Sequence, residues 1–404
     1  MSAAHLPLPP EAVALLDFAR ASRVAHGFAH LDANGEPDPA KPLELWINCR
    51  MTHSFALGAI AGVEGCAELA AHGTAALAGV FADDDHPGWH SAVGWDGLPV
   101  PGEKEAYAHA FVVLAASSAV AAGIAGGEAL LALALDAQER FWWREDDGMV
   151  VDRYDRAMRV VDPYRGINAT MHTVEAYLAA AGVTGDDRWL DRALRMTERA
   201  MGFARAHAWR LPEHYDEQWR PVLDYNRDRP ADPFRPFGAT PGHWMEWARL
   251  ALHIRAELGL RGRAAPSWLL EDAVALFDAA LWEGWDVDGA PGFVYTVDWE
   301  GAPVVRQRMH WVVCEGIGAA VALEKATGED RFADAAAVFW EYVGRYVIER
   351  PGAWRHELSP RNEPAGDTWP GKPDVYHALQ AVLLPGLPLA PAFAPALAAQ
   401  RARG

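Results

Sequence analysis

The sequence is poor in cysteine and in basic residues. Its 404 residues include 3 cysteines, which is an odd number and too few for a disulfide framework, so we expect a reducing, cytoplasmic compartment. Lysine and arginine total 36 against 55 aspartates and glutamates, for a formal net charge of -19. Because so acidic a chain repels phosphate backbones and anionic lipids, we expect neither a nucleic-acid partner nor a membrane role.

Signals for export and for common cofactors are also missing. The opening MSAAHLPLPPEAVALLDFAR has no basic start and no long apolar stretch, so no targeting segment is expected. No phosphate or dinucleotide loop, no Gly-x-Ser-x-Gly elbow and no His-Glu-x-x-His zinc motif occurs, and we expect no cofactor and no metal. The uncharged run at 110–127 is rich in Ala, Gly and Ser, which favours a helix buried in a large soluble core.

The chain does contain strong helical periodicity, with very little strand. Long loops at 207–240, 285–307 and 348–373 separate some of the helices, and loops of that length in a compact domain are usually functional. The predicted helices are 10–26, 51–72, 103–123, 127–142, 168–182, 186–206, 241–259, 266–284, 308–326, 329–347 and 374–384.

Internal repetition predicts how these helices assemble. TGDDRWLDRAL at 184–194 matches TGEDRFADAAA at 327–337, and each follows a helix that opens with Met-His. The spacing indicates six helical hairpins of about 65 to 70 residues each. We expect an all-α fold, a single (α/α)6 barrel domain over 1–404 whose inner helices begin around one mouth. An open array of hairpins is the alternative.

A histidine recurs near the start of three predicted inner helices. His172, His243 and His377 are followed three positions later by Glu175, Glu246 and Gln380, and this spacing places each pair on one helical face. The partial positive charge of a helix start disfavours imidazolium, so these rings should stay neutral and able to accept a proton. We expect the residue three positions on to select the tautomer of each ring.

In a closed barrel these helix starts converge on one pocket. A pocket of neutral histidines with an arginine suits proton abstraction next to a carbonyl, and an open-chain sugar supplies such a carbon. Arg50 would hold the developing enediolate oxygen. The candidate residues are Arg50, His53, Tyr107, Asn168, His172, Glu175, His243, Glu246, His310, Trp311, Glu315, His377 and Gln380.

Two other chemistries are alternatives to this one. A metal site is possible, but helix-bundle carboxylate sites use Glu-x-x-His, the reverse of the order found here. Glycoside hydrolysis needs two facing carboxylates, and although Asp83 and Glu213 stand in loops, no pair is singled out. Several of the 18 tryptophans also fall in polar loops, where we expect them to line a sugar-binding surface.

Five segments resemble the N-acylglucosamine 2-epimerase superfamily and occur in its order over about 45–386. They are RMTHSFALG, YRGINATMHTVEAYLAA, GATPGHWMEWARL, MHWVVCEGIGAA and WPGKPDVYHALQAVLLP. The resemblance implies an (α/α)6 barrel that isomerises or epimerises a monosaccharide without a metal, as a monomer or homodimer. Within the superfamily, the sequence most resembles the bacterial aldose–ketose isomerases that act on mannose, and after them sulfoquinovose isomerase.

The resemblance also implies roles for individual residues. His243 and His377 match an acid–base pair, Arg50, Asn168 and His172 match positions that hold the substrate, and Glu246 matches a carboxylate supporting His243. The implied reaction interconverts D-mannose and D-fructose, with D-lyxose and D-xylulose as further substrates, through a cis-enediol. The alternatives are a 2-epimerase, a sulfoquinovose isomerase and an (α/α)6 glycoside hydrolase. The loop sequences WRHELSPRN and GKPDVYH lack the glutamines expected for a sulfosugar enzyme, which favours a plain hexose.

Overall fold

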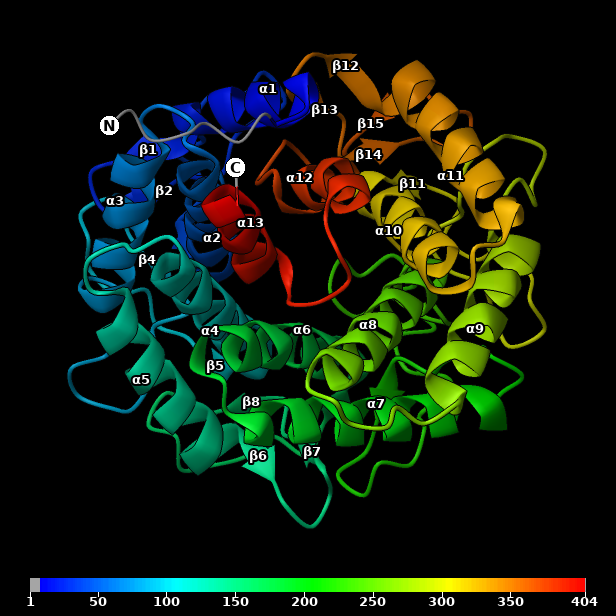
Figure 1. The fold of residues 1–404 in the computed structure, drawn as a ribbon, viewed down its shortest axis with the longest axis horizontal. Helices are drawn as coiled ribbons and strands as arrows, with labels where there is room; N and C mark the ends of the chain where they lie inside the picture. The colour runs from blue at the N-terminus through cyan, green and yellow to red at the C-terminus, as the bar shows by residue number, and fades with distance from the viewer. Residues whose placement is uncertain (1–7, 404) are drawn as a thin grey trace.

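Two concentric rings of helices form the protein, as the computed structural model of residues 8–403 shows (Figure 1). The inner ring consists of α2 (Leu45–Ala61), α4 (Ala106–Ala121), α6 (Ile167–Thr184), α8 (Pro241–Leu260), α10 (His310–Thr327) and α12 (Tyr376–Leu383). The outer ring consists of α1 (Pro10–Ala19), α3 (Cys66–Ala78), α5 (Gly127–Ala137), α7 (Asp187–Ala206), α9 (Trp268–Gly284) and α11 (Asp330–Tyr342). The expected (α/α)6 barrel is confirmed.

The two rings differ in their hydrophobic patterns. Inner helices such as α4 are apolar all round, and α4 is buried from Ala108 to Ala119, as expected of the run at 110–127. Outer helices are buried on one face only. In α7 the buried positions include Trp189, Ala193, Met196 and Ala200, a spacing of three to four residues that follows the helical period. The inner helices are therefore packed between the outer ring and one another.

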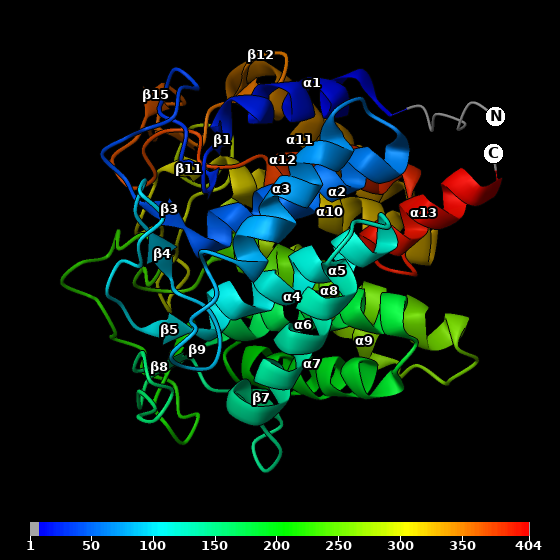
Figure 2. The ribbon, with the colours of Figure 1, turned by 90° about the vertical axis from the view of Figure 1, so that its left-hand side faces the viewer.

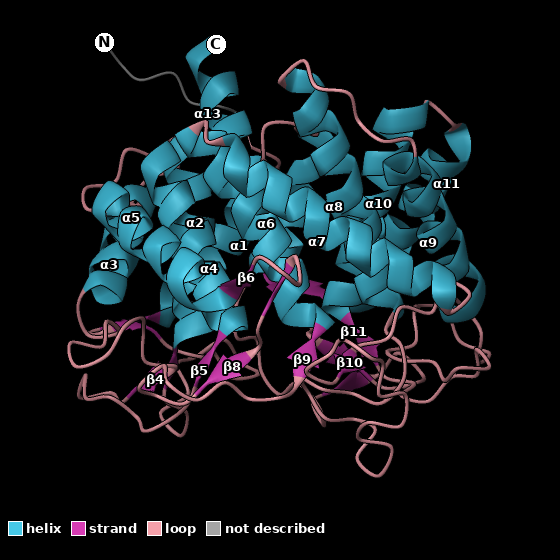
Figure 3. Ribbon diagram, turned by 90° about the horizontal axis from the view of Figure 1, so that it is seen from below, coloured by secondary structure: helices cyan, strands magenta, loops and turns pink. Residues whose placement is uncertain are grey.

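The ring closes on itself rather than forming an open array. Helix α12 packs against α10 and α2, and α1 packs against α12, so the last unit meets the first. A further helix, α13 (Phe393–Arg403), packs against α2, α4 and α6. It lies at the end of the barrel away from the strands and long loops (Figure 2). The other end of the barrel carries those loops and forms the mouth (Figure 3).

Short strands connect the loops to the helices at the mouth. Four of them, β3, β5, β9 and β11, run directly into inner helices α2, α4, α6 and α10, and each pairs antiparallel with a strand from a later loop. The strands are β1 (Arg23–Val24), β2 (Gly27–Phe28), β3 (Leu43–Glu44), β4 (Ala92–Val93), β5 (Lys104–Glu105), β6 (Trp143–Arg144), β7 (Met149–Val150), β8 (Arg153–Tyr154), β9 (Arg165–Gly166), β10 (His214–Tyr215), β11 (Arg308–Met309), β12 (Ile348–Arg350), β13 (Ala353–Trp354), β14 (Glu357–Leu358) and β15 (Pro364–Ala365). These pairings fix the starts of those four inner helices.

Two helix predictions were wrong. The single helix expected at 51–72 is two helices, because Gly62 adopts a left-handed φ of 86° and ends α2, and α3 begins at Cys66. Helix α2 also starts six residues earlier than expected, so His53 lies in its third turn and not in its first. Helix α13 was not predicted. Among residues 8–403 no helix is both long enough and apolar enough to cross a membrane.

Candidate active site

A cavity opens where the inner helices begin. It encloses about 650 Å³ of empty space, counting the part open to solvent. Its walls come from the starts of all six inner helices and from three long loops. The lining residues are Trp46, Arg50, Tyr107, Asn168, His172, Pro233, Phe234, Pro236, His243, Glu246, Tyr295, His310, Trp311, His356, Trp369, Pro373, Asp374 and His377.

Two histidines in this cavity are each held by a buried carboxylate. Nδ1 of His243 lies 2.9 Å from Oε2 of Glu213, and Nδ1 of His377 lies 2.8 Å from Oε1 of Glu315. A carboxylate accepts a hydrogen bond from Nδ1–H, so Nε2 of each ring carries the free lone pair. Burial and the nearby Arg50 cation lower the pKa of His377 well below its ordinary value. His377 is therefore uncharged at neutral pH and able to accept a proton.

Helix α8 begins so that His243 lies against an indole. Pro241 is the first helical residue, where its missing N–H costs nothing, and His243 follows in the same turn. The ring of Trp311 packs 5.0 Å from His243 and 5.8 Å from His377, centroid to centroid. A Cβ at Gly242 would lie 2.5 Å from that indole, so only glycine allows this approach. The two histidines thus flank one aromatic wall.

Arg50 supplies a cation fixed in an aromatic enclosure. Its guanidinium carbon lies 4.5 Å from the ring of Phe111 and 4.6 Å from that of Tyr376. It donates to Oδ2 of Asp374 at 3.2 Å and to the hydroxyl of Tyr107 at 2.9 Å. Burial alone lowers the pKa of Arg50, but Tyr107, Asp374 and Tyr376 raise it above its ordinary value. The side chain is therefore a permanent positive charge beside the two histidines.

Beneath the histidines, three carboxyl groups surround the buried Arg249. Its Nε donates to Oε2 of Glu315 at 2.9 Å, and its NH2 nitrogen lies 3.4 Å from Glu246 and 4.0 Å from Glu175. Burial and the neighbouring Glu315 raise the pKa of Glu246 well above its ordinary value. Burial also raises that of Glu175, but His172, Arg249 and Tyr376 together lower it below the ordinary range. One guanidinium thus stabilises several carboxyl groups, and the charged form of Glu246 is disfavoured.

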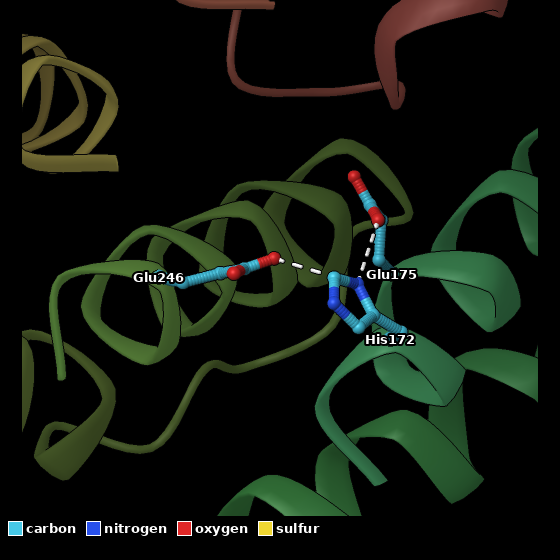
Figure 4. Close-up of side chains that lie close together, drawn as sticks. All are labelled: His172, Glu175 and Glu246. Carbon is cyan, nitrogen blue, oxygen red and sulfur yellow. Dashed lines mark ion pairs between the residues drawn. The ribbon is translucent and has the colours of Figure 1, made fainter. Parts of the chain in front are cut away.

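Three of the side chains at this depth lie close enough together to raise the question of metal binding. His172, Glu175 and Glu246 each offer one ligand atom, and these atoms lie within 4.8 Å of one another (Figure 4). Nδ1 of His172 is 3.6 Å from Glu175 and 3.7 Å from Glu246. The set does not fit a divalent cation, because Arg249 already contacts both carboxyl groups, and burial with the neighbouring Glu315 raises the pKa of Glu246, which disfavours its charged form. Burial also lowers the pKa of His172 to about 4, so these contacts join an uncharged imidazole to the carboxyl groups.

Residues 27–381 match the family model described as N-acylglucosamine 2-epimerase. This chain belongs to the N-acylglucosamine 2-epimerase family. It is 48% identical over 396 residues to a D-mannose isomerase of Pseudomonas cannabina pv. alisalensis, covering 98% of this chain and 95% of that protein. It is equally similar, 48% over 395 residues, to a D-mannose isomerase of Thermobifida fusca, covering 97% and 96%. A solved crystal structure of D-mannose isomerase superposes with a TM-score of 0.84 at 25% identity, covering 93% of this chain and 95% of that one.

Most of the residues expected at this family site from the sequence line the cavity. These are Arg50, Tyr107, Asn168, His172, His243, Glu246, His310, Trp311 and His377. The other four, His53, Glu175, Glu315 and Gln380, do not line it. Glu315 lies behind His377, Gln380 donates a hydrogen bond to Glu175, which also accepts one from Tyr376, and the His53 ring forms a hydrogen bond with Ser118.

The partners expected for two histidines were wrong. His243 is held by Glu213 and not by Glu246, and His377 is held by Glu315 and not by Gln380. A residue three positions along a helix lies about 4.5 Å further along the axis, so it lies below the imidazole rather than beside Nδ1. Each supporting carboxylate comes instead from another segment. Glu213 immediately precedes β10, and Glu315 is on α10.

Several residues of the cavity were not predicted. Asp374 lies two residues before α12, where its Oδ1 accepts from the backbone N–H of Tyr376 at 2.8 Å and its Oδ2 binds Arg50. The dipeptide Pro-Asp before a helix is the signal that could have revealed it. His310 stacks on His356 with ring centroids 3.8 Å apart, and burial lowers the pKa of both. His356 lies in a long loop that has no helical pattern to mark it.

The expectation for the loop tryptophans was largely wrong. Trp89 and Trp219 are each only 4% exposed and pack in the core, and Trp95 is exposed but lies outside the cavity. Trp369 does line the cavity, together with Trp46 at the start of α2. Most of these loop tryptophans therefore pack their loops against the core, and fewer of them line the cavity.

Proposed function

We propose that this protein interconverts D-mannose and D-fructose by moving a proton between C2 and C1 of the open-chain sugar. The observation that carries the proposal is the pair of carboxylate-held histidines, His243 and His377, beside the fixed cation of Arg50 in one cavity. The relatives named as D-mannose isomerases, at 48% identity over nearly the whole chain, support the same substrate. D-Lyxose and D-xylulose, which share the geometry at C1 and C2, are proposed as further substrates.

Opening the sugar ring requires an acid and a base on either side of the hemiacetal. One removes the proton of the C1 hydroxyl and the other, carrying a proton on Nε2, gives that proton to the ring oxygen. His243 and His377 are suitably placed groups for the two tasks, and a proton passed back between them restores both rings before the next step. The C1 aldehyde then acidifies the hydrogen on C2. Because His377 is uncharged at neutral pH, its Nε2 can accept that proton, and Glu315 stabilises the imidazolium that forms.

Loss of the C2 proton leaves a cis-enediolate with negative charge on oxygen. Arg50 provides positive charge for that oxygen, and its own contacts with Asp374 and Tyr107 hold it in place before the reaction starts. Glu246 also lines the cavity, and because burial raises the pKa of its carboxyl, it can form a further hydrogen bond with the sugar. Moving the hydroxyl proton from O2 to O1 and returning the abstracted proton to C1 gives the ketose, whereas returning the abstracted proton to the opposite face of C2 would give the 2-epimer.

A sulfosugar substrate is disfavoured by the charges in the cavity. Among the described residues that line it, Arg50 is the one arginine or lysine, and Asp374 offsets its charge. A sulfonate would therefore lack a free cation. Glycoside hydrolysis is disfavoured because the two carboxyl groups that line the cavity, Asp374 and Glu246, are engaged by Arg50 and Arg249. We propose a metal-free mechanism because the carboxylate cluster does not fit a divalent cation.

Proton NMR in heavy water tests the proposal directly. Purified protein treated with EDTA is incubated with D-mannose, D-fructose or D-glucose, and both the product and the carbon that gains deuterium are identified. We expect fructose from mannose, with deuterium at C1 of fructose and, through the reverse reaction, at C2 of mannose. Binding without exchange, or conversion of mannose to glucose without fructose, would each contradict it.

We further propose a single-domain enzyme acting in the cytoplasm as a monomer or homodimer. The three cysteines are free and buried, which supports a reducing compartment. The two rings share one continuous hydrophobic core, which supports a single domain. Cell fractionation and light scattering on the purified protein would test location and assembly, and a periplasmic protein or a higher oligomer would contradict these two points.

A further inference from the structure

A second cavity lies beside the first and shares walls with it. It encloses about 990 Å³ of empty space, again counting the part open to solvent. Tyr107, Asn168 and Phe234 line both cavities. The remaining walls come from the loop before α6 and from residues 225–235 of the long loop before α8. The two cavities are therefore neighbours separated by a few side chains.

The second cavity has the chemistry of a sugar-binding surface. Tyr164 and Tyr225 contribute aromatic rings 5.2 Å apart. Asp152 and Arg235 pair at 3.3 Å, and burial raises the pKa of Asp152 to about 6. The side-chain oxygen of Asn168 is buried without a hydrogen-bond partner among the described residues. Aromatic faces with a few fixed donors and acceptors bind neutral, hydroxyl-rich ligands.

Phe234 forms the partition between the two cavities. Its ring contacts those of Trp369 and Tyr107 at centroid distances of 4.9 Å and 6.0 Å, both edge to face. The backbone beneath it is held in place, because Oδ1 of Asp232 accepts from the N–H groups of Phe234 and Arg235 at 3.2 Å and 2.9 Å. The side chain is nevertheless 44% exposed, so its removal leaves the core and these backbone contacts intact.

We propose that Phe234 restricts the catalytic cavity to monosaccharides, and that the second cavity accepts the second ring of a reducing disaccharide once this side chain is removed. The proposal rests on the mannose–fructose activity proposed above. The reaction at the reducing end is unchanged, since a proton still moves from C2 to C1 and the glycosidic bond is neither formed nor broken. The product is the corresponding keto-disaccharide.

The test compares mannose with β-1,4-mannobiose and α-1,6-mannobiose in wild type, Phe234→Ala and Phe234→Leu. We expect Phe234→Ala to raise the ratio of disaccharide to mannose kcat/KM by about 10-fold or more for at least one linkage, because one aromatic contact that excludes a ligand is worth at least a tenfold factor. Phe234→Leu keeps much of the bulk and should change the ratio less. Adding Tyr225→Ala to Phe234→Ala removes a wall of the second cavity and should return the ratio toward the wild-type value.

Each outcome decides between the two proposals. If wild type converts mannose but Phe234→Ala changes all substrates equally, the partition is refuted and the mannose activity stands. A wild type that converts mannobiose as well as mannose refutes the partition too. A gain that survives the addition of Tyr225→Ala refutes the second cavity as the binding place. If no form of the protein converts mannose, although circular dichroism shows it folded, the proposed function fails and the inference fails with it.

Discussion

Replacing Glu315 with glutamine should lower kcat for mannose by about 10- to 100-fold and leave KM near its wild-type value. The 2.8 Å hydrogen bond from Nδ1 of His377 to Glu315 strengthens when the imidazole becomes charged. Hydrogen bonds to charged groups contribute about 1.5–3 kcal/mol, and about 1.4 kcal/mol corresponds to a tenfold change in rate. A glutamine amide can also donate to Nδ1, which would move the ring proton to Nε2 and block proton acceptance.

The assay combines steady-state kinetics with deuterium exchange at C2, so that the proton-transfer step is measured apart from product release. Glu257→Gln is the matched control. Glu257 is also buried and pairs with an arginine, Arg261 at 2.9 Å, but it lies toward the opposite end of α8 from His243. The reasoning is refuted if Glu315→Gln exchanges deuterium at the wild-type rate, or if Glu257→Gln slows exchange as much as Glu315→Gln does.

Three further results are expected. His243→Asn and His377→Asn should each lower kcat by about 100- to 10,000-fold while calorimetry still detects sugar binding, and a kcat within tenfold of wild type would contradict their acid–base roles. The melting temperature should fall steeply between pH 6.5 and pH 4, because burial lowers the pKa of His53 and His310 to about 4 and of His109 to about 3. Below pH 6.5 the unfolded chain binds protons at these histidines and the folded chain does not, so the free energy of unfolding falls by about 1.4 kcal/mol per pH unit for each histidine. An unchanged melting temperature would contradict this prediction. Dialysis against EDTA should leave mannose conversion unchanged, whereas a loss restored by one divalent ion would overturn the metal-free mechanism.

The fold could be predicted because its signals are local and repeated. The apolar inner helices, the one-sided outer helices and the matching TGDD and TGED turns each follow from short-range sequence patterns. The errors have local causes as well. The helix predicted at 51–72 ran through an apolar stretch in which only Gly62 and Gly65 mark the break. The C-terminal helix α13 is rich in alanine and begins after a proline-rich segment, so its start was hidden.

The convergence of the histidines could be predicted, but their hydrogen-bond partners could not. Ring closure brings helix starts together regardless of their distance in sequence, so a repeated position identifies candidates. A hydrogen bond to one ring nitrogen depends on which neighbouring segment passes beside it. Glu213 lies 30 residues before His243 and Glu315 lies 62 before His377, and no periodicity links either pair.

The structure changes how the recurring His-x-x-Glu pattern is interpreted, because Glu246 does not hold the histidine that precedes it. Because each inner helix runs inward from the mouth, three residues correspond to about 4.5 Å of depth, and the pattern therefore encodes two layers. The histidines form the layer nearer the mouth, and Glu175 and Glu246 form a deeper layer around Arg249, in which Glu246 still lines the cavity. Glu315 belongs to both, since one oxygen binds Arg249 and the other binds His377. Arg249 thus fixes the carboxylate that orients His377, and the lower layer positions the imidazole rather than binding a metal.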